Sequence, residues 1–230
     1  MTSTATLKRL LSDAETLLID FDGPICSVFS GVPSAVVAEK LRSTVKRFSE
    51  HRLPTAVAQT GDPFVVFLYA AGLGAEAAQA TESELSVLEN ESIARAEPTV
   101  GSYELLKKWH RSGRKAAIVS NNGQSAVNRY IEKADIRGFV DYISARTSFD
   151  PSLLKPNPYL VERAVQKLSS TPDKAVLIGD SPSDIAAAKR CGVTSIGYAN
   201  RPAKLEKLSH AQVVVSCLGS VVEALGYTSD

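Results

Sequence analysis

The stretch TLLIDFDGP, residues 16–24, decides the fold. It is a short apolar run that leads into Gly23 and Pro24, which is typical of a buried strand followed by a turn. Two carboxylates, Asp20 and Asp22, therefore stand where this strand ends. In open α/β sheets ligands bind outside the carboxyl ends of the strands, so these two acids are the first candidate functional residues.

Strands and helices alternate over the part of the chain that follows Pro98. Apolar runs predict strands over residues 16–21, 115–120, 139–144, 175–179 and 194–198, and a further strand over 212–216. Amphipathic spacing predicts helices over residues 102–111, 124–133, 158–168 and 182–191. Strands that are apolar throughout and alternate with helices indicate a parallel sheet covered on both faces. The predicted fold class is therefore α/β, with a Rossmann-like parallel sheet core.

The segment between the first strand and the next strand–helix unit has a different character. Apolar residues recur there at helical spacing, residues 64–71 and 85–96 also look helical, and no alternating strand pattern is present. We therefore expect an all-helical cap over residues 26–98, inserted into an α/β core made of residues 1–25 and 99–230. Prolines and glycines gather at the two crossings, near residues 26–30 and 96–101, where we expect hinges.

Composition and charge exclude several classes of protein. The 230 residues include 26 basic and 25 acidic side chains, a net charge of +1, which gives no reason to expect nucleic acid or a membrane surface as partner. No apolar stretch is long enough to span a bilayer. Cys26, Cys191 and Cys217 are widely spaced and odd in number, so we expect no disulfide framework and a cytoplasmic location. Oligomeric state leaves no signature in the sequence.

Side chains suited to phosphate chemistry stand at the ends of the predicted strands. They are Asp20, Asp22, Ser120, Asn121, Asp180 and Asp184, together with Lys155 in the loop LLKPNP. Carboxylates are the hard oxygen ligands that Mg²⁺ prefers, and they should repel one another unless a cation lies between them. A hydroxyl, an amide and an ammonium group can hold phosphate oxygens. The sequence thus predicts one crevice that binds magnesium and a phosphate group.

Four motifs carry a family resemblance. LLIDFDGP, IVSNN, LLKPNP and LIGDSPSD occur in this order and resemble the motifs of the haloacid dehalogenase superfamily, particularly the phosphoglycolate-phosphatase-like group with a helical cap. The resemblance implies a magnesium-dependent phosphatase that hydrolyses a small phosphorylated metabolite through an aspartyl-phosphate intermediate. A sugar phosphomutase and a non-catalytic binding or regulatory protein are the alternatives on the same fold.

The resemblance also implies a role for each residue. Asp20 would be the nucleophile and a metal ligand, and Asp22 the general acid and base, with its backbone carbonyl on the metal. Asp180 would bind Mg²⁺ directly, and Asp184 would bind it through water or orient its neighbours. The remaining three residues would hold or neutralise the phosphate: Ser120, Asn121 and Lys155.

Several of these residues also have a plainer structural interpretation. Ser181 and Asp184 have the spacing of a capping box, so Asp184 alone could be purely structural. Asn122-Gly123 is typical of a turn. Pro24 stands where the family usually has threonine, and it supplies neither a hydroxyl nor an N–H group for placing Asp22. Four basic residues of the cap are candidate anion contacts, although a solvated helix face is the plainer interpretation: Arg42, Arg47, His51 and Arg52.

Overall fold

The computed structural model describes residues 4–226, and its core is a six-stranded sheet. The strand order is β5-β4-β1-β6-β7-β8, and all neighbouring strands are parallel. The strands are β1 (Thr16–Ile19), β4 (Lys115–Gly123), β5 (Tyr142–Arg146), β6 (Ala175–Gly179), β7 (Thr194–Tyr198) and β8 (Val213–Val215). The predicted α/β fold with a parallel sheet is confirmed.

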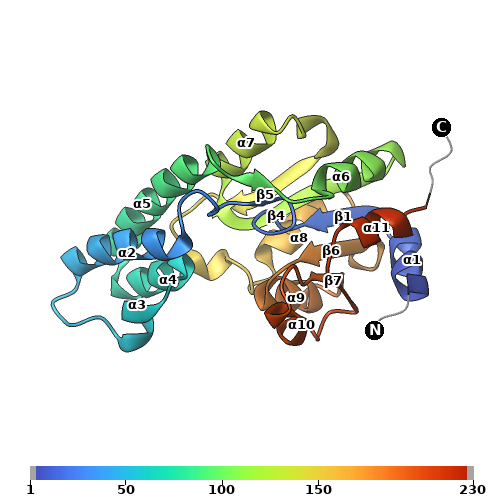
Figure 1. Ribbon diagram of the computed structural model, residues 1–230. Helices are drawn as coiled ribbons and strands as arrows, with labels where there is room; N and C mark the ends of the chain where they lie inside the picture. The colour runs from blue at the N-terminus through green and yellow to red at the C-terminus, as the bar shows by residue number, and fades with distance from the viewer. Residues whose placement is uncertain (1–3, 227–230) are drawn as a thin grey trace.

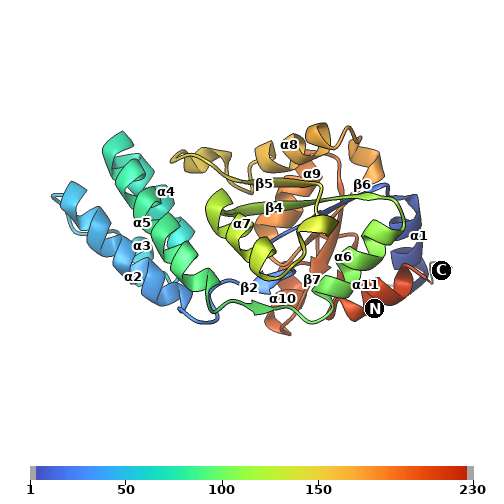
Figure 2. The same ribbon diagram turned by 90° about the horizontal axis from the view of Figure 1, so that it is seen from above.

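Helices cover both faces of this sheet (Figure 2). One face carries α1 (Thr4–Asp13), α6 (Ser102–Arg111), α7 (Gln124–Lys133) and α11 (Gly219–Ala224), and the other carries α8 (Tyr159–Lys167) and α9 (Pro182–Arg190). Strand β1 shows why its sequence is apolar throughout, since Leu17 and Ile19 enter one core cluster and Leu18 enters the other. Within residues 4–226, no helix combines the length and the apolar character that a bilayer span requires.

The cap lies at one end of the sheet (Figure 1). It consists of α2 (Ser34–Val45), α3 (Thr55–Gln59), α4 (Pro63–Leu73) and α5 (Ala75–Ile93), with a 3-10 turn at Lys46–Phe48. The prediction of helices here is confirmed. A two-residue antiparallel ribbon, formed by β2 (Cys26–Ser27) and β3 (Glu97–Pro98), joins the two chain crossings.

Helix α5 fastens the cap to the core. It packs against α7, and Asn90 Nδ2 donates a hydrogen bond of 2.9 Å to Ser125 Oγ. Leu85 and Leu88 of α5 belong to the same buried apolar cluster as Leu18 of β1. The cap therefore shares its apolar core with the sheet.

Two sequence predictions near β4 and β5 are wrong in detail. The strand predicted over residues 139–144 is β5, which begins at Tyr142, because Arg137–Phe139 form a 3-10 helix and the Phe139 ring packs edge-on against Tyr103 at 5.5 Å. The turn predicted at Asn122-Gly123 is absent, since β4 continues through Gly123 with an irregular register after Val119.

Candidate active site

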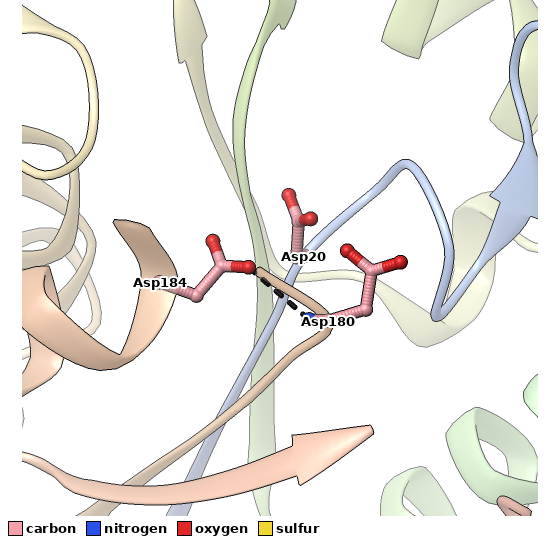
Figure 3. Close-up of side chains that lie close together, drawn as sticks. All are labelled: Asp20, Asp180 and Asp184. Atoms are coloured by element: carbon pink, nitrogen blue, oxygen red, sulfur yellow. Dashed lines mark hydrogen bonds between the residues drawn. The ribbon is translucent and has the colours of Figure 1, made fainter. Parts of the chain in front are cut away.

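Two neighbouring parallel strands and the helix that follows one of them bring three carboxylates together. Asp20 follows β1 and Asp180 follows β6, and the Asp20 N–H donates to the Ile178 carbonyl at 2.8 Å. Asp184 lies in the first turn of α9. Figure 3 shows the three side chains around one point, and each offers an oxygen within 4.8 Å of the others. The sheet topology thus places the predicted acids in one cluster.

Lys155 bridges two of these carboxylates. Its buried Nζ lies 2.7 Å from Asp20 Oδ1 and 2.5 Å from Asp184 Oδ1, and it donates to the Val119 carbonyl at 2.8 Å. Burial alone would lower the pKa of Lys155, but the carboxylates of Asp184 and Asp20 raise it above its ordinary value. The site therefore contains a fixed ammonium charge directly beside Asp20.

Asn121 holds the backbone of Lys155 in place. Its Nδ2 donates to the Lys155 carbonyl at 3.0 Å, and its Oδ1 accepts from the Lys155 N–H at 2.8 Å. Asn121 and Lys155 line a cavity of about 740 Å³ together with Asp20 and Asp22. Ser120 lies behind this surface, fully buried, and its Oγ donates to Asn122 Oδ1 at 3.1 Å. Two of the three predicted phosphate contacts thus open onto the cavity.

Asp184 is engaged through both of its oxygens. Its Oδ2 accepts from the N–H groups of Asp180 and Ser181, at 3.1 and 3.0 Å, and from Ser181 Oγ at 2.8 Å. The capping box that the sequence spacing indicates is present at the start of α9. Because Oδ1 contacts Lys155, this carboxylate orients Asp180 and Lys155 from a fully buried position.

Asp22 sits in a loop that requires glycine at the next position. Its Oδ1 accepts from the Val28 N–H at 2.9 Å. Burial raises the pKa of Asp22 to about 6, with the Val28 N–H acting against this and the charge of Asp180 adding to it. Gly23 has a φ of +107°, and a Cβ there would lie only 2.1 Å from Asp180 Oδ2.

The loop around Pro24 is held by other donors. Thr99 Oγ1, directly after the cap, donates to the Gly23 carbonyl at 2.5 Å, and the Gly23 N–H donates to the Cys26 carbonyl at 2.7 Å. The Val28 N–H also donates to the Asp22 carboxylate, so these hydrogen bonds hold Asp22 in place without a group from Pro24.

A second lysine, which the sequence analysis missed, contacts the cluster. Lys204 Nζ forms an ion pair with Asp180 Oδ2. Burial raises the pKa of Asp180, while the charge of Lys204 acts to lower it. The pKa of Asp20 is raised by burial and by the charge of Asp184. The expected repulsion is therefore partly offset by two ammonium groups. Three carboxylates facing two ammonium groups still leave a negative set of hard oxygen donors, which fits a divalent cation such as Mg²⁺.

Comparison with known proteins identifies the family. Residues 72–198, more than half of the chain, match the sequence profile of the haloacid dehalogenase-like hydrolases. The chain belongs to this family.

The similarities to individual hydrolases are partial in sequence and extensive in fold. The pyrophosphatase PpaX of Halalkalibacterium halodurans is 33% identical over 46% of this chain and 49% of its own length. The phosphoglycolate phosphatase of Aquifex aeolicus is 29% identical over 47% of this chain and 57% of its own length. The chain thus spans about half the length of these curated relatives. A predicted phosphatase from Clostridium acetobutylicum shares the fold with a TM-score of 0.70, at 16% identity, over 91% of this chain and 97% of that one.

The sequence analysis did not predict one further network of buried polar side chains. Glu89 of the cap helix α5 is fully buried and accepts from Asn122 Nδ2 at 3.0 Å and from the Gly123 N–H at 2.9 Å. Arg146 of β5 pairs with Glu89 at 2.8 Å and donates to the Asn121 carbonyl at 2.8 Å. The only local sign of this network in the sequence is the position of Glu89 on the inward side of a helix.

The basic cap residues lie elsewhere. Arg42 is mostly buried, pairs with Glu39 at 2.7 Å and donates to the Thr60 carbonyl at 2.7 Å. With His51 and Arg52 it lines a separate cavity within the cap. Arg47 stacks on Phe48, 5.8 Å from the ring centroid. Within the described residues, none of the four lines a cavity that reaches Asp20 or Asp22.

Proposed function

We propose that this chain is a magnesium-dependent phosphatase that hydrolyses a small phosphorylated metabolite through an aspartyl phosphate on Asp20. The observation that carries the proposal is the contact of Lys155 Nζ with Asp20 Oδ1, 2.7 Å, inside a cluster of carboxylates. An anionic nucleophile that attacks an anionic phosphate needs neighbouring positive charge, and this ammonium group supplies it. A purely binding protein has no need of a nucleophile so placed.

The metal would be held by oxygens of Asp20 and Asp180 and by the backbone carbonyl of Asp22, with Asp184 orienting the set. When bound, Mg²⁺ neutralises charge on the transferring phosphoryl group.

In the first step, an Asp20 carboxylate oxygen attacks phosphorus and the bond from phosphorus to the alcohol oxygen breaks. Asp22 gives its proton to the departing oxygen. In the second step, water attacks the same phosphorus, Asp22 takes a proton from that water, and the bond to Asp20 breaks to release inorganic phosphate. A pKa of about 6 suits a group that must act as acid and then as base near neutral pH.

The size of the site supports a small substrate. Cavities that hold small molecules span about 300–1,000 Å³, and the cavity beside Asp20 measures about 740 Å³. The curated relatives are named as phosphatases, which favours water over a sugar as the final acceptor, and so hydrolysis over the mutase alternative. We place the enzyme in the cytoplasm as part of this proposal, because Cys26, Cys191 and Cys217 are free thiols.

Hydrolysis of p-nitrophenyl phosphate tests the proposal. We expect turnover with Mg²⁺, loss of turnover in EDTA, recovery on adding Mg²⁺ back, and no turnover in Asp20→Asn, whose amide cannot form an acyl phosphate. Undiminished activity in the chelator, or in a clean preparation of Asp20→Asn, would refute the proposal.

A further inference from the structure

A second cavity adjoins the first at the aspartate cluster. It measures about 850 Å³, and it shares Asp22, Asp180 and Ser181 with the cavity beside Asp20. One wall comes from residues 200–207 of the core, and the opposite wall comes from the starts of the cap helices α2 and α4. Because Asp22 faces both spaces, this second cavity lies on the side from which a proton would reach the leaving group.

The core wall of this cavity is basic. Arg201, Lys204 and Lys207 all line it, within and just before the short helix α10 (Ala203–Lys207). Arg201 and Lys207 are exposed, and neither forms an ion pair with any residue of the described chain, 4–226. Lys204 contacts Asp180 with a partly exposed side chain. Two unpaired positive charges and one shared charge therefore face the space next to Asp22.

The cap wall carries one acidic side chain, which opposes only part of the charge of the basic wall. This residue is Asp62, whose Oδ1 caps α4 by accepting from the Phe64 N–H at 2.8 Å. Pro33 and Ser34 also line the cavity, where α2 begins without a side-chain cap and without an acidic residue in its first turn. The free N–H groups of that turn carry partial positive charge, which adds to the charge of the three basic side chains.

We propose that Arg201, Lys204 and Lys207 bind a second anionic group, carried by the leaving part of the substrate. The inference rests on the proposed function and narrows its substrate class to small phosphate esters or anhydrides that bear a further carboxylate or phosphate. Lys204 touches Asp180, and an Asp180 carboxylate oxygen lies within 4.8 Å of one from Asp20. The second anion is therefore only a short linker away from the phosphorus that Asp20 attacks. Discrimination then comes from the core segment 201–207 and not from the cap residues Arg42, Arg47, His51 and Arg52.

Matched substrates test this inference. Phosphoglycolate and ethyl phosphate share the same phosphate ester and differ by a carboxylate against a methyl group, and pyrophosphate supplies a second phosphate in its place. We expect kcat/KM for the doubly anionic compounds to exceed that for ethyl phosphate at least tenfold. In the double variant Arg201→Gln/Lys207→Gln that ratio should fall at least tenfold, since even one charged contact to an anion is worth about that factor. The relative loss for phosphoglycolate and for pyrophosphate shows which anion the wall prefers.

A control variant separates local contact from general charge. Lys8→Gln/Arg9→Gln removes the same two charges from the exposed side of α1, which lies at the opposite end of the molecule from the cap (Figure 1). The ratio should not change in this variant. A ratio that is unchanged in Arg201→Gln/Lys207→Gln, or that falls equally in the control, would overturn the inference.

Direct binding keeps the inference separate from catalysis. Calorimetry of phosphoglycolate with Asp20→Asn should give about tenfold tighter binding than with Asp20→Asn/Arg201→Gln/Lys207→Gln, while ethyl phosphate should bind the two nearly alike. This holds whether or not the wild type turns over any substrate, so absence of turnover refutes the proposed function alone. Equal phosphoglycolate affinities in the two proteins would refute the second anion site alone.

Discussion

The cap carboxylate of Glu89 accepts a 3.0 Å hydrogen bond from the side-chain amide of Asn122, a residue that lines the active-site cavity. Asn122 in turn accepts a hydrogen bond from Ser120, and Arg146 joins Glu89 to the Asn121 carbonyl. A residue of the cap thus fixes the end of core strand β4. Helix α5 is therefore the element whose buried polar side chain ties the cap to the core.

Glu89→Gln tests this anchor. The substitution leaves Arg146 buried with only Glu82 as an acidic partner, at 3.2 Å. Breaking a buried ion pair costs about 3–5 kcal/mol, and the remaining pair places the expected loss in unfolding free energy near the lower end, about 3 kcal/mol. Chemical denaturation measures it, with the exposed Glu91→Gln on the same helix as control. Equal stability of the two variants would contradict the anchor.

The raised pKa of Asp22 predicts a pH dependence of stability. Its pKa rises from 3.8 to about 6 on folding, because the carboxyl group is buried. Between about pH 4 and pH 6 the folded protein then holds this proton more tightly than the unfolded chain does. Stability from this group is full below its unfolded pKa and is lost as the pH rises through 6.

Comparison of the wild type with Asp22→Asn isolates that contribution. In EDTA, the unfolding free energy of the wild type relative to Asp22→Asn should fall as the pH rises from 4 to 6 and then level off. Subtraction removes the contributions of the other acids to a first approximation. A relative stability that is flat, or that increases over this range, would show that Asp22 is not buried as described.

Lys204 should weaken metal binding by the protein alone. Its ammonium group occupies one oxygen of Asp180 and repels a cation that approaches the cluster. Lys204→Gln should therefore bind Mg²⁺ several-fold more tightly by calorimetry without substrate, whereas the exposed Lys8→Gln should match the wild type. Weaker binding in Lys204→Gln would mean that Lys204 holds Asp180 in its ligand geometry.

Lys155 should be a structural counter-charge as well as a catalytic one. Lys155→Met removes the cation between Asp20 and Asp184 and leaves two buried carboxylates without it. In EDTA we expect a loss of about 3–5 kcal/mol in unfolding free energy, and part of this loss should be recovered when Mg²⁺ is added. Thermal denaturation with and without the metal measures both effects. A variant as stable as the wild type in EDTA would show that the ammonium group does not hold the cluster together.

Local sequence signals were sufficient to predict most of the strands and helices of the core. Strands β6 and β7 and helices α6 and α7 have the predicted bounds, because a short apolar run or a regular amphipathic spacing specifies each of them. Helix α5 was predicted to begin at residue 85 but begins at Ala75, since its first turns are rich in alanine and polar residues and lack a strong apolar stripe.

Local sequence signals could not predict the contacts between segments that are distant in the sequence. Lys204 meets Asp180 across 24 residues, and Arg146 meets Glu89 across 57. Neither pair has a local pattern. The neighbouring strands β6 and β7 bring Lys204 to Asp180, and the packing of the cap helix α5 on the core brings Glu89 to Arg146. The wrong prediction of a turn at Asn122 has the same cause. The side-chain amide of Asn122 can be buried because it donates a hydrogen bond to Glu89, and Glu89 is distant in the sequence.

The central claim is that Asp20 accepts the phosphoryl group, and rapid-quench trapping tests it most directly. Asp22→Asn removes the base that activates water, so the variant should accumulate phosphoenzyme with p-nitrophenyl phosphate, whose good leaving group needs little protonation. Mass spectrometry of the acid-quenched protein should find one phosphoryl group, on the peptide that contains Asp20, only when Mg²⁺ is present. Turnover without any phosphoenzyme in the quenched protein, or a phosphoryl group on another residue, would contradict the account.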